Sequence, residues 1–452
     1  MKKGEAPLGQ LLWPPPTLKS EQSGNPSFQT IAANVGWLIG DRILRMGLGV
    51  VVVVLVGRYL GPEQFGLLNF AMAFAGLFGF LTTLGLDNII IVELVTRSHN
   101  ASETLGTGVV LRACGSVLTS IAVPMGMYAI GERDHLTLSI GAILGGAALF
   151  RTFDIFDLQF QARVRSKYTV WAGGVSFLIV ASTKLALIWR HAPLIRFAWV
   201  DFAGAVLTGV GLAVIYRWTG GTLRSWRFNP DQAKRLLSAG WPLMLSSLAI
   251  VIYMKIDQVM LKRMLGADAV GVYSAATRLS EVWYFIPTTI VSSVFPSIVE
   301  SHHANPDRYY RRLRGLFSLM SLLALAIAVP MTVLSRPLVL LLFGARYEAA
   351  GAILAVHIWA ALFVFWGVAQ EPWNIAEGLQ RLTLYRTMAG AILNVGLNLL
   401  LIPSYGGVGA AVATVTAYGV AAWLGNALDR RTRVMFFLQA KSILFPKYLL
   451  NS

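Results

Sequence analysis

Charged residues are scarce in this chain. Only 13% of its 452 residues are Asp, Glu, Lys or Arg, whereas 56% are hydrophobic. An ordinary soluble domain carries about 25% charged residues. So few charges cannot cover the surface of a soluble protein of 49.2 kDa, and the high hydrophobicity excludes an intrinsically disordered chain. The composition therefore predicts an integral membrane protein.

Several kinds of functional site are also missing. The single cysteine, Cys114, excludes an intramolecular disulfide and a cysteine-based metal cluster. The six histidines are scattered, and the chain has neither an HExxH nor a GxxxxGK[ST] sequence. We therefore expect no metal, no cofactor and no built-in ATPase. An enzymatic alternative is an integral-membrane glycan polymerase, which usually needs a large extramembrane domain. Because no loop is long enough for such a domain, we expect a protein that is not an enzyme.

Apolar stretches of about 20 residues, the length needed to cross a bilayer, recur along the chain. They form two groups of six, so we expect an all-α membrane protein with an N-terminal lobe over 29–216, a cytoplasmic linker over 217–238 and a C-terminal lobe over 239–428. Residues 1–28 lack the apolar core of a signal peptide and are predicted to be a disordered cytoplasmic tail, and 429–452 a basic cytoplasmic tail. The twelve expected spans are 31–56, 65–86, 105–130, 136–152, 169–189, 194–216, 239–261, 270–298, 315–341, 349–370, 383–402 and 408–428.

The positive charges fall unevenly between alternate loops. The chain carries 38 Lys and Arg against 22 Asp and Glu, a net charge of +16. With the expected spans, 24 loop and tail cations lie on one side and eight on the other. Cytoplasmic loops carry the excess of Lys and Arg, so both termini are predicted to be cytoplasmic. Most of the basic excess is then a topology signal, and we expect no nucleic-acid partner.

A short motif occurs once at the first expected hairpin of each lobe. Residues 58–66 and 263–271 both fit Arg-x-Leu-Gly-x-acid-x-apolar-Gly, 205 residues apart. Glycine permits the positive φ of a tight reversal between helices. Because six spans separate the copies, the two lobes enter the membrane in the same sense, as in transporters with parallel repeats. The motif residues are Arg58, Gly61, Gly66, Arg263, Gly266 and Gly271.

Ionisable residues inside spans are costly and usually face a protein interior or an aqueous cavity. Arg112 and Lys184 have no acidic residue nearby in sequence, so we expect unpaired cations, whereas Arg278 and Glu281 have the i,i+3 spacing of a helical pair. Unpaired cations suit a phosphate or pyrophosphate. The candidates for a substrate-binding cationic cavity are Arg45, Arg112, Lys184, Lys255 and Arg278; Asp41 and Asp257 are candidates for ion coupling, although Asp257 could instead lie at the membrane interface.

Three motifs resemble the polysaccharide biosynthesis family of O-antigen and exopolysaccharide flippases. They are GRYLGPEQFG at 57–66 followed by LGLD at 84–87, IYMKIDQVML at 252–261 followed by GVYSAA at 271–276, and FQA with KY between 160 and 168. The resemblance extends over about residues 30–428. It implies the fold of the multidrug/oligosaccharidyl-lipid/polysaccharide exporter superfamily, a V-shaped pair of six-helix lobes working by alternating access.

The same resemblance implies a function. Such a protein would move a polyprenyl-pyrophosphate-linked oligosaccharide from the inner to the outer leaflet of the cytoplasmic membrane of a bacterium or archaeon, with basic cavity residues holding the pyrophosphate. It would act as a monomer among membrane lipids, beside a glycan polymerase and glycosyltransferases. The alternatives are a cation-coupled multidrug antiporter of the same fold, using Asp41 or Asp257, and a lipid II flippase, a group that typically has two further spans.

Overall fold

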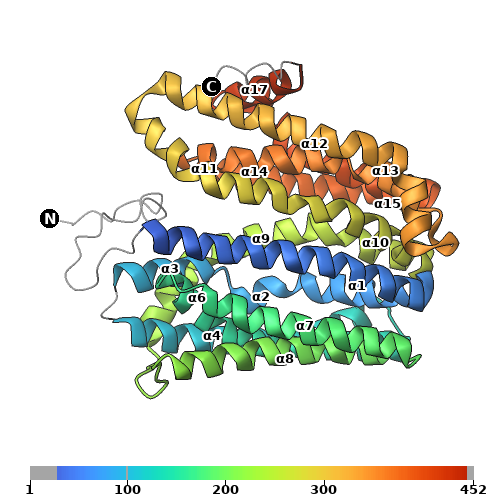
Figure 1. Cartoon of the computed structure of the whole chain (residues 1–452), viewed down its shortest axis with the longest axis horizontal. Helices are drawn as coiled ribbons and strands as arrows, with labels where there is room; N and C mark the ends of the chain where they lie inside the picture. The colour runs from blue at the N-terminus through green and yellow to red at the C-terminus, as the bar shows by residue number, and fades with distance from the viewer. Residues whose placement is uncertain (1–27, 98–99, 445–452) are drawn as a thin grey trace. The chain divides into compact units, whose positions relative to one another are not determined.

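Every regular element in the described part of the chain is helical. The computed structural model describes the backbone of residues 28–97 and 100–444; the side chains at 28–39, 41–44, 303–304 and 444 lie outside the description, as do the expected tail up to residue 27 and the carboxylate of Asp41. Figure 1 shows the arrangement. The helices are α1 (Phe28–Leu77), α2 (Gly79–Thr83), α3 (Asp87–Thr96), α4 (Ala101–Ala129), α5 (His135–Ala147), α6 (Asp154–Ala162), α7 (Lys167–Trp189), α8 (Leu194–Trp218), α9 (Pro230–Leu265), α10 (Ala267–Glu281), α11 (Phe285–Ala304), α12 (Pro306–Phe343), α13 (Ala350–His357), α14 (Ala360–Ala376), α15 (Gln380–Gly419), α16 (Gly425–Leu428) and α17 (Arg433–Leu444).

Eleven helical stretches among the described residues are long and apolar enough to cross a membrane, which confirms the expected all-α membrane fold. The count differs from twelve because α1 and α15, which bend at glycines with positive φ, Gly61 (72°) and Gly406 (56°), each count as one stretch, whereas Gly79–Thr96 counts as a stretch of its own. The two arms of α15 correspond to the expected spans 383–402 and 408–428.

Both breaks are reversals of the chain. A Cβ placed on Gly57 would lie 3.7 Å from the ring of Phe65, and one on Gly409 would lie 2.7 Å from the carbonyl carbon of Leu401. In a continuous helix, residues eight positions apart are separated by about 12 Å. Each of these long helices is therefore a hairpin, and the second arm of α1 leads through α2 into α3 (Figure 1).

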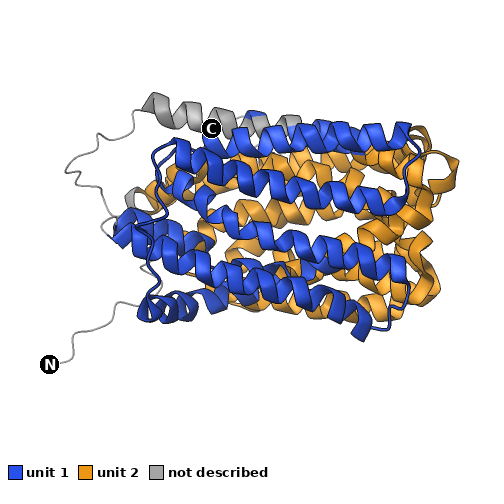
Figure 2. Ribbon diagram, turned by 90° about the horizontal axis from the view of Figure 1, so that it is seen from below, with its two compact units in different colours: residues 1–52, 74–248 blue, residues 53–73, 249–452 orange. Residues whose placement is uncertain are grey.

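The chain divides into two compact units, coloured separately in Figure 2. Unit 1 comprises residues 1–52 and 74–248, and unit 2 comprises 53–73 and 249–452. The turn at Gly61 in α1 thus belongs to unit 2, with the helices of the second half of the sequence. The lobe boundaries at 216 and 239 stay a prediction.

The expected linker over 217–238 is packed against unit 1. The Trp226 ring lies 5.7 Å from the Tyr216 ring, and Asn229 Nδ2 donates a hydrogen bond of 2.6 Å to Glu103 Oε1 at the start of α4. The helix α9 begins within this segment, at Pro230. These contacts attach the segment to the end of α8 and to the first turn of α4, so it is a structured part of unit 1.

The turns at Gly266 and Gly344 in unit 2 have almost the same backbone conformation as the turn at Gly61. Gly61 (φ 72°, ψ 170°), Gly266 (90°, −177°) and Gly344 (90°, 175°) all lie in a region that is essentially restricted to glycine. The third turn contacts the first, because the Tyr347 hydroxyl donates a hydrogen bond of 2.7 Å to the Gly57 carbonyl. Burial raises the pKa of Tyr347 well above its usual value, which keeps this donor protonated.

The two copies of the sequence motif cross each other at their second glycines. A Cβ on Gly66 would lie 2.8 Å from the backbone nitrogen of Gly271, and one on Gly271 would lie 2.7 Å from the carbonyl carbon of Pro62. Both distances are shorter than Cβ contacts in proteins allow. The absence of a side chain at Gly66 and Gly271 therefore permits the two helices to pack backbone to backbone.

The helix α17 is part of the unit 2 core. It lies within the expected basic tail over 429–452, whose last residues, 445–452, lie outside the description, and it packs on α12, α14 and α16. The Ser442 and Ser321 hydroxyls lie 2.6 Å apart, and the fully buried Gln439 donates to Gln370 Oε1 at 3.1 Å while its own oxygen accepts from Asn426 at 3.0 Å. The buried side-chain amides of Gln439, Gln370 and Asn426 form hydrogen bonds with one another. These bonds fix the position of α17 within unit 2, because a buried amide that lost its partner would be costly.

Candidate functional site

Arg112 of α4 is the most buried of the candidate cations. Its side chain is 2% exposed, and Nη2 donates to Asp87 Oδ1 at the first residue of α3. Nη1 also contacts the Arg151 carbonyl at 3.4 Å, and Nε has no partner among the described residues. The expectation of an unpaired cation at Arg112 is therefore wrong, because the fold brings Asp87 to it from a helix that precedes α4.

Lys184 of α7 is also paired. Its Nζ lies 2.6 Å from Asp201 Oδ1 of α8, and the two side chains are 14% and 17% exposed. The sequence separation of 17 residues hid this partner, because α7 and α8 run side by side as neighbouring helices. The cavity expected to be lined by unpaired cations thus has two of its members neutralised within unit 1.

Arg45 of α1 lies against α7. Its Nη2 is 2.6 Å from the position that a Cβ on Gly173 would occupy. The side chain of Arg45 is half-buried, and a larger residue at position 173 would make its guanidinium shift. Gly173 therefore permits this close approach of Arg45 to α7, and the sequence pattern did not single it out.

In unit 2, Glu281 pairs with Lys255 and not with Arg278. The carboxylate of Glu281 pairs with Lys255 of α9, with both oxygens 3.3 Å from Nζ, rather than with Arg278 on its own helix. Arg278 is exposed and forms no ion pair among the described residues; its one recorded polar contact there is 3.5 Å long, to Asn69 Oδ1. The i,i+3 pairing inferred for Arg278 and Glu281 is therefore wrong.

Asp257, the second candidate for ion coupling, is buried to 2% exposure in unit 2. Its carboxylate accepts hydrogen bonds from the Tyr273 hydroxyl, from the Gln258 backbone N–H at 2.8 Å and from the Thr414 hydroxyl at 3.3 Å. Thr414 in turn accepts from Asn394 of α15. A side chain that reaches the lipid headgroups at the membrane interface would be exposed, so this burial does not fit the interface alternative for Asp257.

His357 of α13 lies near this network and was not singled out from the sequence. It is 2% exposed, and its Nδ1 lies 3.0 Å from the Ser280 hydroxyl. The Tyr273 ring packs edge-on to it at 6.0 Å. Among the described residues, no group of three or more His, Cys, Asp or Glu is arranged to hold a metal ion.

Comparison with known families identifies the chain. Residues 31–302, more than half of it, match the family described as polysaccharide biosynthesis protein. The chain belongs to this polysaccharide biosynthesis family. Residues 242–400 also match the MatE family. The resemblance seen in the three sequence motifs is thus confirmed.

Relatives of this polysaccharide biosynthesis protein are found in an archaeon and a bacterium. The probable flippase AglR of Haloferax volcanii is 24% identical over 394 residues, which are 83% of this chain and 78% of the relative. The succinoglycan biosynthesis transport protein ExoT of Rhizobium meliloti is 23% identical over 348 residues, 73% of this chain and 65% of the relative. One relative is thus named as a probable flippase and the other as a transport protein.

Solved structures support the same fold for the family member. The lipid II flippase MurJ, in an inward closed conformation, has a TM-score of 0.73 at 15% identity and covers 93% of both chains. An inward-facing multidrug resistance transporter of the MATE family has a TM-score of 0.71 at 14% identity, over 89% of this chain and 95% of that one. The protein is therefore a multi-pass membrane protein with a two-lobe transporter fold.

Proposed function

We propose that this protein is a flippase that moves a polyprenyl-pyrophosphate-linked oligosaccharide from the inner to the outer leaflet of the cytoplasmic membrane by alternating access. Membership of the polysaccharide biosynthesis family, with relatives named as a flippase and as a succinoglycan transport protein, carries the proposal. The cargo would be the repeat unit of an O-antigen, capsule or exopolysaccharide. Both termini would be cytoplasmic. Glycosyltransferases would act before this protein in the pathway, and a glycan polymerase would act after it.

The pairing of the intramembrane charges supports a ranking of the residues that would hold the pyrophosphate. Arg112, Lys184 and Lys255 each have a carboxylate partner, so an anionic headgroup would have to displace that partner. Arg278 has none among the described residues, and its planar guanidinium can bind phosphate oxygens bidentately. We therefore rank Arg278 first among the five candidates.

Replacing Arg278 with glutamine should slow translocation by about 10–100-fold, because a charge-assisted hydrogen bond contributes ~1.5–3 kcal/mol. The measurement uses proteoliposomes that contain a fluorescent polyprenyl-pyrophosphate oligosaccharide, and follows its loss of accessibility to a membrane-impermeant quencher. Arg278→Lys should retain part of the rate, because it keeps the charge but loses the bidentate geometry.

Arg263→Gln is the matched control for Arg278→Gln. Arg263 is exposed and lies at the hairpin turn. Its substitution removes the same charge as the substitution of Arg278. A rate that falls equally in both variants would point to a general charge effect and would count against headgroup binding by Arg278.

Asp257→Asn tests ion coupling. Asparagine keeps the size of the side chain, and its one oxygen can still accept from Tyr273 and Thr414, but it cannot carry a charge and loses the acceptor for the Gln258 N–H. We expect the variant to fold with a somewhat lower melting temperature and to lose the acceleration of translocation that an imposed sodium or proton gradient produces. Glu300→Gln, an exposed carboxylate on α11, should keep that response; if Asp257→Asn also keeps it, Asp257 has no coupling role.

The same proteoliposomes separate the alternatives. Efflux of a cationic dye that depends on Asp257, without glycan-lipid translocation, would favour a cation-coupled multidrug antiporter. Translocation of fluorescent lipid II at a rate equal to that of the oligosaccharide lipid would favour a lipid II flippase. We expect neither, because the relatives are named as a probable flippase and as a succinoglycan biosynthesis transport protein.

A further inference from the structure

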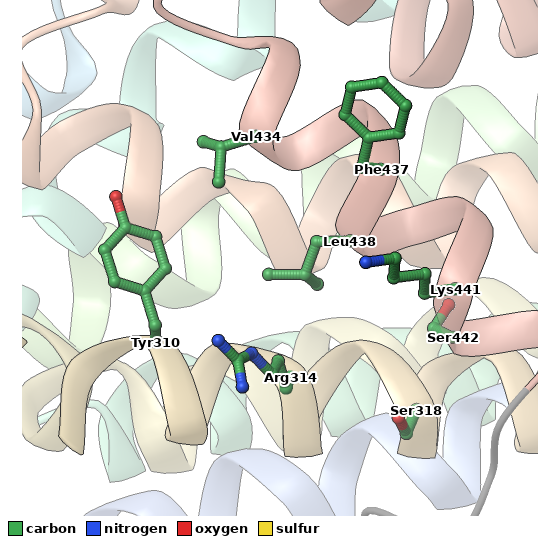
Figure 3. A pocket seen from close by; sticks show the side chains of 8 residues that line it. All are labelled: Tyr310, Arg314, Ser318, Val434, Phe437, Leu438, Lys441 and Ser442. Carbon is green, nitrogen blue, oxygen red and sulfur yellow. The ribbon is translucent and has the colours of Figure 1, made fainter. Parts of the chain in front are cut away.

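A cavity of about 370 Å³ lies between α12 and α17 in unit 2. This volume is within the range of about 300–1,000 Å³ typical of small-ligand sites. Figure 3 shows the side chains around it, which come from the first half of α12 and from the length of α17. The lining residues are Tyr310, Arg314, Ser318, Val434, Phe437, Leu438, Lys441 and Ser442.

The charge of this cavity is positive and uncompensated. Arg314 of α12 and Lys441 of α17 are both exposed, and neither forms an ion pair or a hydrogen bond with another described residue. No carboxylate of residues 28–97 or 100–444 lines the cavity. Two cations presented by two different helices, with no acid between them in these described ranges, make a site for an anion.

The walls of the cavity are apolar. On α17, Val434 and Phe437 are 41% and 57% exposed and lie on the same helix face as Lys441. A helix that exposes apolar side chains beside cations is typical of the membrane interface. Arg314 supports this position from α12, because it precedes the long apolar run that begins at Leu316.

The two helices hold the cations in fixed positions. The Ser442 and Ser321 hydroxyls join α17 to α12, and the buried Gln439 is held by Gln370 and Asn426. The cavity is therefore preformed, and a ligand need not order α17 in order to bind.

We propose that this cavity binds the phosphate-bearing headgroup of an anionic membrane lipid, with Arg314 and Lys441 contacting the phosphate and Phe437 and Val434 contacting the adjoining chains. Basic pockets between helices at the cytoplasmic interface suit such headgroups. Free phosphate would use the cations alone, whereas the exposed apolar walls favour a lipid. The site shares no residue with the proposed headgroup site of the translocated substrate, so either proposal can fail without the other.

The test is a titration of the purified full-length protein in neutral detergent with dioleoyl phosphatidylglycerol, with bound lipid counted by native mass spectrometry. The double variant Arg314→Gln/Lys441→Gln should bind this lipid about 10–30-fold more weakly, the effect expected of two interfacial cations. Arg308→Gln/Arg311→Gln removes two exposed charges from the same helix outside the cavity and should change the affinity less than threefold. Equal losses in the two double variants would overturn the proposal, and so would unchanged binding in the first.

Two further arms identify the ligand and exclude misfolding. Arg314→Lys/Lys441→Arg keeps both charges and should retain lipid binding; a loss as large as that of the glutamine variant would overturn the assignment of the two cations. Phe437→Ser should weaken phosphatidylglycerol binding several-fold. Inorganic phosphate titrated alone should bind far more weakly than the lipid, and equal affinity would overturn the lipid assignment.

Discussion

Gly271→Val should prevent the protein from reaching a stable folded state. A Cβ at this position would lie 2.7 Å from the carbonyl carbon of Pro62, and backbone atoms cannot move aside as a flexible side chain can. Overpacking typically costs 1–3 kcal/mol, and a clash with backbone belongs at or above about 3 kcal/mol, a large fraction of a total stability of ~5–15 kcal/mol. We expect most of the variant to aggregate on solubilisation, as measured by the monodisperse fraction in size-exclusion chromatography.

Gly315→Ala is the control for this substitution. Gly315 lies inside α12 with ordinary helical φ, and nothing surrounds the position of its Cβ within 4 Å. Alanine there should leave the melting temperature unchanged or raise it, because the helix gains up to ~1 kcal/mol. If Gly271→Val and Gly315→Ala give the same monodisperse fraction, then the close crossing of the two motif copies does not exist.

Asp87→Ala should destabilise the protein by about 3 kcal/mol. Arg112 is 2% exposed, and Asp87 is its carboxylate partner, so the substitution leaves a buried guanidinium with the Arg151 carbonyl at 3.4 Å. Removing one member of a buried ion pair costs roughly 3–5 kcal/mol, and the lower end applies because Asp87 is 47% exposed. The melting temperature of the detergent-solubilised protein measures the effect.

Two variants show whether the loss comes from the orphaned charge. Glu93→Ala breaks the exposed Glu93–Arg97 pair, 3.2 Å long on α3, and should cost only about 0.3–0.5 kcal/mol. Arg112→Met in the Asp87→Ala background removes the buried charge and should recover much of the lost stability. A double variant less stable than Asp87→Ala would contradict the account.

The glycine turns could be predicted from the sequence because their cause is local. The reversal at Gly61 needs a backbone conformation that few residues other than glycine adopt. The second copy of the nine-residue pattern, at 263–271, places Gly266 at the same position, and Gly266 has nearly the same backbone conformation. That the two copies touch each other could not be predicted, because the contact depends on the packing of helices 205 residues apart.

The partners of the buried cations were missed for the same physical reason. Asp87 is 25 residues from Arg112, Asp201 is 17 from Lys184, and Glu281 is 26 from Lys255. Spacing within one helix reports only neighbours at i,i+3 and i,i+4, whereas each of these pairs joins two helices. A usable signal for Asp87 is its place as an acidic residue in the first turn of a helix that follows an apolar hairpin.

The position of residues 53–73 in unit 2 has a consequence for biosynthesis. The hydrogen bond from Tyr347 to the Gly57 carbonyl joins residues 290 positions apart, and translation proceeds at about 5–20 residues per second. The first hairpin therefore waits roughly 15–60 s for the segment that completes its surroundings. During that interval the backbone at Gly66, which packs against the helix of Gly271 in the folded protein, is exposed to non-native contacts. A ribosome that pauses before residue 271 should therefore leave a nascent chain that depends on a membrane chaperone or is degraded.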